Sequence, residues 1–206
     1  MSVLRPFRAT DLFKFNNMYA YGISFYLSYL ARWPDLCCAQ EAPSGRMMGY
    51  IIGKAEGPGT DWHGHVTALT VAPEYRRLSL ARKMMDLLEH VSDQSYRGYF
   101  VDLYVRCTNQ AAITMYERLG YSVYRRVGEY YGSLGLGRSA KDEEDAFGES
   151  TLLLLSLHMC PKENTGALID TMAVFTDMRK PLSRDPYRRS VRPGGREIVV
   201  SAHDVS

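Results

Sequence analysis

Apolar and polar positions alternate with two different periods along the first 131 residues. Apolar residues at Leu80, Met84, Leu87 and Leu88 recur at the spacing of an amphipathic helix, which predicts a helix over Leu80–His90. Alternating segments with β-branched residues, bounded by Gly or Pro, predict strands. By these criteria strands are expected at Ser2–Phe7, Met47–Ala55, His63–Val71, Tyr99–Val105 and Tyr121–Tyr131. Further helices are expected after an N-cap at Thr10-Asp11, at Gly22–Trp33 and at Gln110–Leu119.

The order of these elements predicts the fold class. Strands that alternate with helices favour an α/β (α+β) fold with a mixed sheet and at least one parallel βαβ unit. We expect this domain to span residues 1–131. From 132 to 206 the chain is glycine-rich, then charged, then basic, without a clear period, so this C-terminal extension is expected to be largely loop or disordered.

The composition argues against several classes of protein. A chain of 206 residues that is 46% hydrophobic can bury one sizeable core. A net charge of +2 is too small to indicate a nucleic-acid-binding protein. The N-terminus does not resemble a signal peptide, and the apolar run at Leu152–Leu155 is far shorter than the ~20 residues of a membrane helix. We therefore expect a soluble cytoplasmic protein that binds neither membranes nor nucleic acid directly.

The segment from Val71 to Ala81 is the first candidate for chemistry. A strand ends, a turn with Arg76 and Arg77 follows, and a helix begins after the small residue Ser79. The first N–H groups of a helix and its dipole attract anions, and two arginines would add positive charge there. Taken alone, the arginines are as well explained by a solvated turn.

Arg76-x-x-Ser79-x-Ala81 resembles the pyrophosphate loop of the GNAT acetyltransferases, with Ser79 where the family usually has Gly. Asn109 and Tyr116 occur downstream in the order and separation of that superfamily. The resemblance implies a GNAT fold, with helices flanking the mixed sheet, and acetyl-CoA as co-substrate. By resemblance, acetyl-CoA would be bound by Leu69, Thr70, Val71, Arg76, Arg77, Ser79, Leu80, Ala81, Asn109 and Tyr116.

Further segments resemble the catalytic subunits of NatB-type N-terminal acetyltransferases. These segments are Leu4–Phe7, Trp62–Leu69, Phe100–Leu103, Leu119–Arg125, Glu129–Tyr131, Asp177–Lys180 and Ser190–Pro193. The resemblance implies acetylation of the N-terminal amine of nascent chains that begin with Met followed by Asp, Glu, Asn or Gln. It also implies a heterodimer with a large helical-repeat auxiliary subunit that docks the enzyme at the ribosome.

The resemblance also assigns roles to individual side chains. Peptide would be bound by Tyr21, His65, Thr67, Tyr130 and Tyr131, with His65 helping to choose the second residue. Tyr131 or His65 would accept the amine proton through water and Tyr116 would protonate the departing thiolate, with no metal. Taken alone, His65 is more often a satisfied strand histidine, and the tyrosine pair more often packs.

The aromatic helix around residues 22–33 is a candidate surface for the auxiliary subunit. Its aromatic and leucine side chains would form this surface, unless they pack on the protein's own sheet, which explains some of them equally well. The residues concerned are Phe25, Tyr26, Tyr29 and Leu30.

Two departures from the family accompany these expectations. Between Asn17 and Tyr21 an acidic segment that forms one wall of the family's peptide groove is absent. Gly148 to Thr176 interrupts a segment that is continuous in the family, and its ends can be encoded with splice signals, so we hypothesise a retained intron. The first departure raises an alternative function, a catalytically impaired subunit that binds acetyl-CoA and its partner. A GNAT enzyme for small-molecule amines is disfavoured by Tyr130, Tyr131 and the His-Gly-His strand.

Overall fold

Most of the residues that the computed structural model describes form strands and helices joined by short turns. The described residues are 2–14, 22–128 and 174–201. They group into two compact units, and residues of strands β5 and β7 fall in both. The first unit comprises residues 1–103 and 180–190, and the second comprises residues 104–179 and 191–206.

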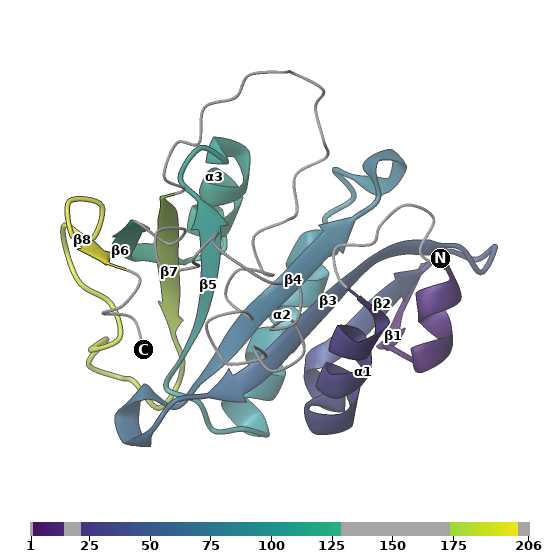
Figure 1. Ribbon diagram of the computed structural model, residues 1–206, viewed down its shortest axis with the longest axis horizontal. Helices are drawn as coiled ribbons and strands as arrows, with labels where there is room; N and C mark the ends of the chain where they lie inside the picture. Colours follow the sequence, from purple (N-terminus) through teal and green to yellow (C-terminus); the bar gives the residue numbers. More distant parts are fainter. Residues whose placement is uncertain (1, 15–21, 129–173, 202–206) are drawn as a thin grey trace, which may run out of the picture. The chain divides into compact units, whose positions relative to one another are not determined.

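The first unit is built on a mixed sheet (Figure 1). Its strand order is β1-β2-β3-β4-β5, antiparallel except for β4 and β5, which are parallel. Helix α2 connects β4 to β5, so the predicted βαβ unit is confirmed. The strands are β1 (Val3–Pro6), β2 (Cys37–Glu41), β3 (Met47–Glu56), β4 (His63–Val71) and β5 (Phe100–Arg106).

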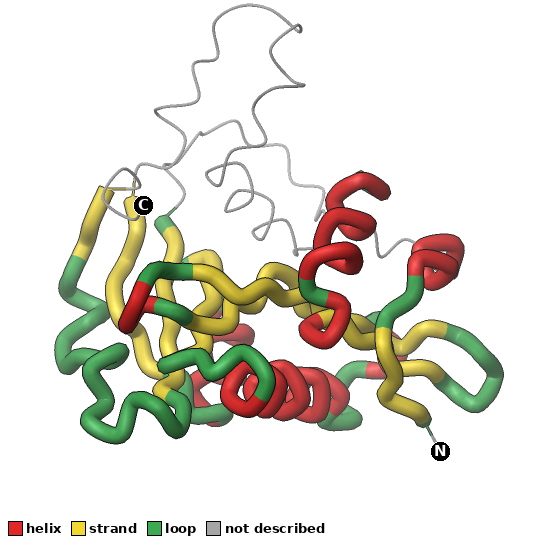
Figure 2. Tube along the Cα trace, turned by 90° about the horizontal axis from the view of Figure 1, so that it is seen from below, coloured by secondary structure: helices red, strands yellow, loops and turns green. Residues whose placement is uncertain are grey.

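Two helices cover opposite faces of this sheet (Figure 2). On one face the Tyr26 hydroxyl of α1 lies 3.0 Å from the Tyr50 hydroxyl of β3. On the other face Met84 of α2 packs so closely on Gly49 that a Cβ there would lie 3.3 Å from it. Short 3-10 turns join the other elements. The helical segments of this unit are η1 (Ala9–Lys14), α1 (Ile23–Arg32), η2 (Pro34–Leu36), η3 (Gly59–Asp61), η4 (Pro73–Tyr75) and α2 (Leu80–Gln94).

The second unit contains the remaining strands and one helix. Its strand order is β5-β7-β6-β8, with β6 antiparallel to β7 and parallel to β8. Asp177 on β7 is fully buried and pairs with the guanidinium groups of Arg125 and Arg179. The elements are α3 (Gln110–Arg118), β6 (Ser122–Gly128), β7 (Phe175–Pro181) and β8 (Val199–Ser201).

The expected class, a mixed sheet with flanking helices, is confirmed, and two short strands lie within the segment expected to be largely irregular. The strand expected over Tyr121–Tyr131 corresponds to β6 as far as Gly128, and β7 and β8 follow it in the chain. Phe175 and Thr176 of β7 lie inside the segment interpreted as an insertion and pair with Val127 and Arg126. The sequence misses this strand because a short strand of mixed polarity depends on its neighbours rather than on its own pattern. Residues 182–198 are turns and irregular backbone, as expected.

The structure leaves several expectations about domain boundaries and departures from the family untested. The division of the chain at residue 131 stays a prediction. Most of the hypothesised insertion, up to residue 173, and the loop at 15–21 lie outside the described residues. Within the described ranges, none of the helices has the length and apolar character needed to cross a membrane.

Candidate active site

Strand β4 carries the first group of candidate residues. His65 is 2% exposed and Thr67 is 1% exposed, so both side chains are inside the first unit. The register with β3 shifts between Gly53↔Val66 and Ile52↔Ala68, which leaves Thr67 as the extra residue of a β-bulge. Bulges redirect side chains and are common next to active sites.

His65 is held by a buried carboxylate on the neighbouring strand. His65 and Asp102 are register partners in the parallel β4–β5 pair, and His65 Nδ1 lies 2.8 Å from Asp102 Oδ1. Asp102 Oδ1 also lies 3.3 Å from Nε2 of His63. The His63 ring stacks on Phe100 at a centroid distance of 4.5 Å, and its Nδ1 is hydrogen-bonded to the carbonyl oxygen of Asp61.

The charges of this cluster follow from its burial. Burial alone would raise the pKa of Asp102, but the two imidazoles beside it hold that pKa well below its usual range. Burial opposes the charge of His63, yet Asp102, the Asp61 carbonyl and Glu56 together raise the pKa of His63 to about 9. At neutral pH Asp102 is therefore an anion and His63 a cation.

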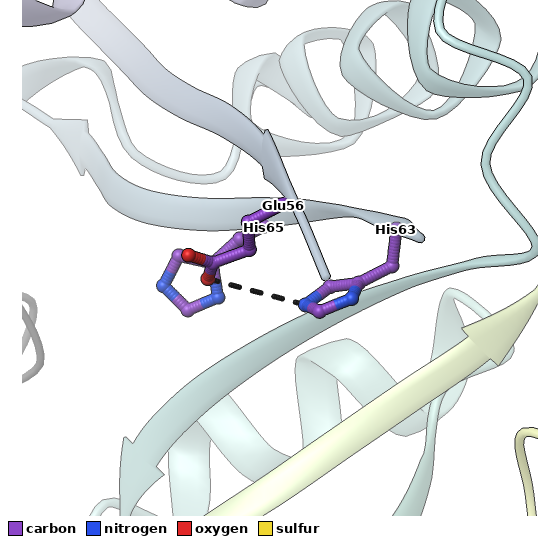
Figure 3. A group of neighbouring side chains, drawn as sticks. All are labelled: Glu56, His63 and His65. Carbon is purple, nitrogen blue, oxygen red and sulfur yellow. Dashed lines mark ion pairs between the residues drawn. The ribbon is translucent and has the colours of Figure 1, made fainter. Parts of the chain in front are cut away.

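Glu56, His63 and His65 have the side chains of metal ligands and point toward one another (Figure 3). One ligand atom of each lies within 4.8 Å of the others. However, Glu56 is already paired with Lys54, and His63 carries a proton that a metal would have to displace. The cluster therefore fits a network of ion pairs better than a metal site, and the absence of a metal in the reaction stays a prediction.

Thr67 is connected to helix α1. Its hydroxyl donates to the hydroxyl of Tyr29 at 3.4 Å, and burial raises the pKa of Tyr29 to about 12. The Tyr29 ring in turn lies 4.6 Å from the Phe25 ring and 5.4 Å from the Trp33 ring, measured between centroids. This aromatic packing holds the α1 side chains against the bulge.

The turn after β4 has the features of an anion site. Arg76 and Arg77 are exposed, and Arg77 and Ser79 both have left-handed backbone conformations, with φ 64 and φ 57. Ser79 is the N-cap of α2, and its side chain makes no capping hydrogen bond. Leu80, the first residue of the helix, is buried, while Ala81 is partly exposed. The first N–H groups of a helix have no intrahelical acceptor, so this end of α2 offers donors and positive charge together.

The last residues of β4 extend beyond their pairing with β5. That pairing ends at Val66 and Leu103, whereas the pairing with β3 continues to Val71. Leu69, Thr70 and Val71 are partly exposed. Their backbone therefore fits the expected role of hydrogen-bonding a thioester carbonyl.

The second unit holds two further candidates. Asn109 is the N-cap of α3, and its Oδ1 accepts a hydrogen bond from the N–H of Ala112 at 3.1 Å. Tyr116 lies on α3 and is 9% exposed, with its ring 5.9 Å from that of Tyr121. Burial raises the pKa of Tyr116 well above the usual value, so its hydroxyl remains a proton donor at neutral pH.

Three expected site residues cannot be placed. Tyr21, Tyr130 and Tyr131 lie outside the described residues, so the peptide-binding and catalytic roles expected for them stay predictions.

The aromatic residues of α1 are not the outer surface of this helix. Phe25, Tyr26 and Tyr29 are at most 5% exposed and pack on the protein's own sheet, which was the second of the two interpretations. The outward side instead carries Ile23 at 53% and Leu27 at 44% exposure, spaced by one helical turn.

Sequence reasoning did not assign roles to Asp102, His63 or Lys54. Two signals were available. His63 and His65 are two apart on a strand and so share a face, and Asp102 lies within the apolar run Phe100–Leu103, where a buried carboxylate requires a partner. The pairing of Asp102 with these histidines depends on the β4–β5 register, which the sequence does not give.

Comparison with known proteins adds a family relationship. Residues 7–121 match the family described as "Acetyltransferase (GNAT) family". The chain is 47% identical to the N-terminal acetyltransferase B complex catalytic subunit naa20 of Schizosaccharomyces pombe, covering 100% of this chain and 99% of that protein. It is 44% identical to the corresponding NAA20 subunit of Arabidopsis thaliana, covering 97% and 96%.

Solved structures agree with the sequence matches. Chaetomium thermophilum Naa20 in complex with a bisubstrate analogue superimposes with a TM-score of 0.75 at 34% identity, covering 99% of each chain. A chain of the NatB acetyltransferase complex bound to a bisubstrate inhibitor gives a TM-score of 0.70 at 33% identity, again with 99% of each chain covered.

Proposed function

This chain belongs to the GNAT acetyltransferases and, within them, to the catalytic subunits of the N-terminal acetyltransferase B complex; from this membership we propose that it acetylates the N-terminal amine of protein chains beginning with Met followed by Asp, Glu, Asn or Gln. The observation that carries the choice of substrate is His65, a buried histidine on β4 whose Nδ1 is fixed by Asp102. An imidazole ring can form hydrogen bonds with either an acidic or an amide side chain.

Acetyl-CoA fits the end of β4 and the start of α2. The N–H groups at Leu80 and Ala81, with Ser79 and the exposed Arg76 and Arg77, would hold the pyrophosphate. Bound there, acetyl-CoA supplies the acetyl group as a thioester. The similarity to a NatB structure described as bound to CoA supports this co-substrate.

Other backbone and side-chain groups would act on the thioester and pantetheine ends. Backbone N–H groups of Leu69, Thr70 and Val71 would stabilise the charge on the carbonyl oxygen. Asn109 would contact the pantetheine arm, and Tyr116, kept protonated by its burial, would give its proton to the departing thiolate.

The peptide amine needs only modest general-base assistance to act as a nucleophile. A free α-amino group has a pKa of about 7.7 to 8.0, so an appreciable fraction is neutral near pH 7. His65 or Tyr131 would take the remaining proton through a water molecule. Thr67, Tyr21 and Tyr130 would hold the first residues of the peptide, with Tyr29 fixing the Thr67 hydroxyl.

An auxiliary subunit completes the proposal. The relatives are named as subunits of a complex, and we infer a heterodimer with a large helical-repeat partner that brings the enzyme to nascent chains at the ribosome in the cytoplasm. The outward apolar residues Ile23 and Leu27 on α1 are candidates for this contact. Direct contact with membranes or nucleic acid is not part of the proposal.

The decisive experiment measures acetyl transfer to a Met-Asp-initiated peptide and a Ser-initiated control, with the auxiliary subunit co-expressed. Turnover of the Met-Asp peptide alone supports the proposal and means that the absent acidic segment between Asn17 and Tyr21 is dispensable. Tight acetyl-CoA binding with no turnover of either peptide would instead support the catalytically impaired subunit. Turnover of the Ser-initiated peptide alone would contradict the proposed substrate class.

A further inference from the structure

Residues 182–190 are held against the end of α2, within the first unit. The Leu182 N–H donates to the carbonyl oxygen of Tyr99 at 2.9 Å. The Ser183 N–H donates to Asp93 Oδ1 in the last turn of α2 at 3.2 Å, and the Ser183 hydroxyl donates to the same oxygen. These hydrogen bonds fix the segment on the surface beside the turn that joins α2 to β5.

Four exposed arginines gather at this place. The guanidinium of Arg184 donates to the carbonyl oxygen of Arg97 at 2.6 Å and to the hydroxyl of Tyr99 at 2.9 Å, and it lies 4.3 Å from the centroid of the Tyr99 ring. Two more arginines follow in the same segment, where the Arg188 N–H closes a turn on the carbonyl oxygen of Asp185 at 3.0 Å. The four residues, called the arginine patch from here on, are Arg97, Arg184, Arg188 and Arg189.

The positive charge of the arginine patch is only partly balanced. Among the residues that the structure describes, no carboxylate forms an ion pair with any of its four guanidinium groups. The two carboxylates beside the patch already accept other hydrogen bonds, Asp93 from Ser183 and Asp185 from the N–H groups of Arg189 and Ser190. Four cations therefore stand against two anions, and the surface attracts an anionic ligand.

Two arginines of the patch have backbone conformations that suit glycine. Arg97 has φ 55 and Arg188 has φ 53, in the left-handed region that is unfavourable for residues with a Cβ atom. Glycine at either position would relieve this strain, so the arginines do not serve the stability of the backbone. Such strain is common where a side chain is kept for binding.

The chemistry of the arginine patch matches a nucleic acid with unpaired bases. A guanidinium group pairs with phosphate oxygens through two parallel N–H bonds. Tyr187 lies between Arg184 and Arg188 in the sequence, its ring is 80% exposed, and the Arg189 guanidinium lies 5.6 Å from the ring centroid. Exposed aromatic rings with neighbouring arginines stack on unpaired bases.

A protein partner fits this surface less well. The core of a protein interface is apolar, whereas Tyr187 is the only large hydrophobic side chain that is exposed within residues 180–190. Phosphates and bases would use both the charges and the ring.

We propose that the arginine patch, together with Tyr187, is a binding surface for single-stranded nucleic acid, in which the guanidinium groups hold phosphates and the ring stacks on a base. The patch lies at the end of α2, whereas acetyl-CoA is proposed to bind at its start, about 22 Å away along a helix of 15 residues. The two sites are therefore separate, and this binding does not depend on acetyl transfer. The net charge of +2 gave no sign of it because net charge averages over the whole chain and hides a local excess of arginine.

The test measures binding of a fluorescein-labelled single-stranded RNA of about 12 nucleotides to the full-length chain by fluorescence anisotropy, with excess CoA present. CoA occupies the site at the start of α2, so RNA that still binds is held elsewhere. With four phosphates paired, the logarithm of the association constant should fall with the logarithm of the salt concentration at a slope of about −3. A second arm uses single-stranded DNA of the same sequence, and the tighter of the two identifies the source of the strand. Displacement of both strands by CoA, or no binding of either, would overturn the proposal.

Substitutions in the patch separate binding from stability. Arg97→Gly combined with Arg188→Gly removes two charges where glycine relieves strain, so thermal stability should be kept or raised. RNA affinity should fall at least tenfold, and the salt slope should become shallower by about 1.4. Tyr187→Leu should weaken binding about tenfold without changing the slope. The control is Arg46→Gln, at an exposed arginine that pairs with Glu74 just before α2, which should leave RNA binding unchanged.

The outcomes separate this proposal from the proposed function. The double glycine variant should acetylate a Met-Asp peptide as the wild type does, because neither arginine belongs to the proposed acetyl-transfer site. If the wild type binds RNA but acetylates no peptide, only the proposed function fails. A glycine variant that binds RNA as tightly as the wild type would exclude the patch as the binding surface. If the wild type binds neither strand and the glycine variant no longer co-purifies with the auxiliary subunit, the patch is a protein contact and the proposal is wrong.

Discussion

At the scale of single residues, Ser79 has a backbone conformation that is unfavourable for its residue type. It precedes α2 with φ 57 and ψ 22, a left-handed conformation that costs an L-residue about 1–2 kcal/mol and a glycine almost nothing. Its hydroxyl makes no capping hydrogen bond, so the side chain does little to offset this conformational cost in the folded protein.

Replacing Ser79 tests this strain. Ser79→Gly should raise the free energy of unfolding by about 0.5–1 kcal/mol and keep acetyl-CoA binding, because the backbone is already in the conformation that glycine prefers. Ser79→Val should lower it, since a β-branched residue is poorly tolerated there. Urea denaturation measures both; a Val variant as stable as the wild type would contradict the prediction.

At the scale of elements, the sequence of β7 gives little indication that this segment forms a strand. Phe175 is 2% exposed and Met178 is fully buried, so the strand contributes to a core although it follows a segment that lies outside the described residues. Its pairing with β6 also places part of the hypothesised insertion in the sheet.

Phe175→Ala should therefore destabilise the protein strongly. Loss of a buried phenylalanine ring costs about 3–5 kcal/mol, because it removes apolar burial and leaves a cavity. The matched control is Val199→Ala on β8, where the side chain is 62% exposed and the change should stay within about 0.5 kcal/mol. Equal, small effects in thermal unfolding would mean that β7 is not part of the core.

Helix α1 permits a second test at this scale. Its inward aromatic residues stabilise the fold, whereas Leu27 points outward at 44% exposure. Leu27→Asp should leave thermal stability nearly unchanged but weaken co-purification of the auxiliary subunit at least tenfold. Ser28→Asp, at the next exposed position of the same helix, adds the same negative charge without removing an apolar side chain and is the control. Undiminished co-purification of the Leu27 variant would exclude this side of α1 from the contact.

At the scale of the whole molecule, the buried ion pairs make stability depend on pH. The pKa of His63 rises from 6.5 to about 9 on folding, so its contribution is fully present below pH 6.5 and is lost as the pH rises through 9. Burial opposes the charge of Asp11, but this carboxylate accepts hydrogen bonds from the Arg5 guanidinium and the Arg8 N–H, which lower its pKa, just as the two imidazoles lower the pKa of Asp102. The contribution of both carboxylates is therefore present above the ordinary aspartate range near 4 and is lost at lower pH.

Stability is therefore expected to be greatest between about pH 5 and 6.5. Between pH 6.5 and 9.5 the free energy of unfolding should fall by an amount on the order of 2 to 3 kcal/mol from His63. Urea denaturation across this range is the measurement. His63→Gln should remove most of the fall, and His90→Gln should not; a profile that is flat from pH 6.5 to 9.5 in the wild type would refute the assignment.

The length of the native chain is a further question at this scale. If Gly148 to Thr176 is a retained intron, mass spectrometry of the protein from its own cells should find no peptide within this segment, and a transcript should lack its codons. Native peptides that map inside the segment would contradict the hypothesis.

Much of the fold was accessible from the sequence because it depends on local patterns. The expected strand His63–Val71 agrees with β4, and Leu80 was predicted as the first residue of a helix and is the first residue of α2. Alternation of apolar and polar residues is sufficient to predict such a strand. Helical periodicity after a small residue is sufficient to predict where such a helix begins. Strand β2, with the sequence Cys37–Glu41, was missed because five residues with little exposure show no alternation that distinguishes a strand.

The sequence by itself determined the family and the turn between β4 and α2, and it singled out His65, Thr67, Asn109 and Tyr116 as candidates, because these depend on motifs of adjacent residues. Only the tertiary structure decided that Asp102 lies between His63 and His65, since residues 37 apart meet through the register of two parallel strands. The same reason applies to β7, which becomes a strand because β6 supplies its hydrogen-bond partners. Contacts between distant segments place the charged side chains around His65, and no local pattern encodes them.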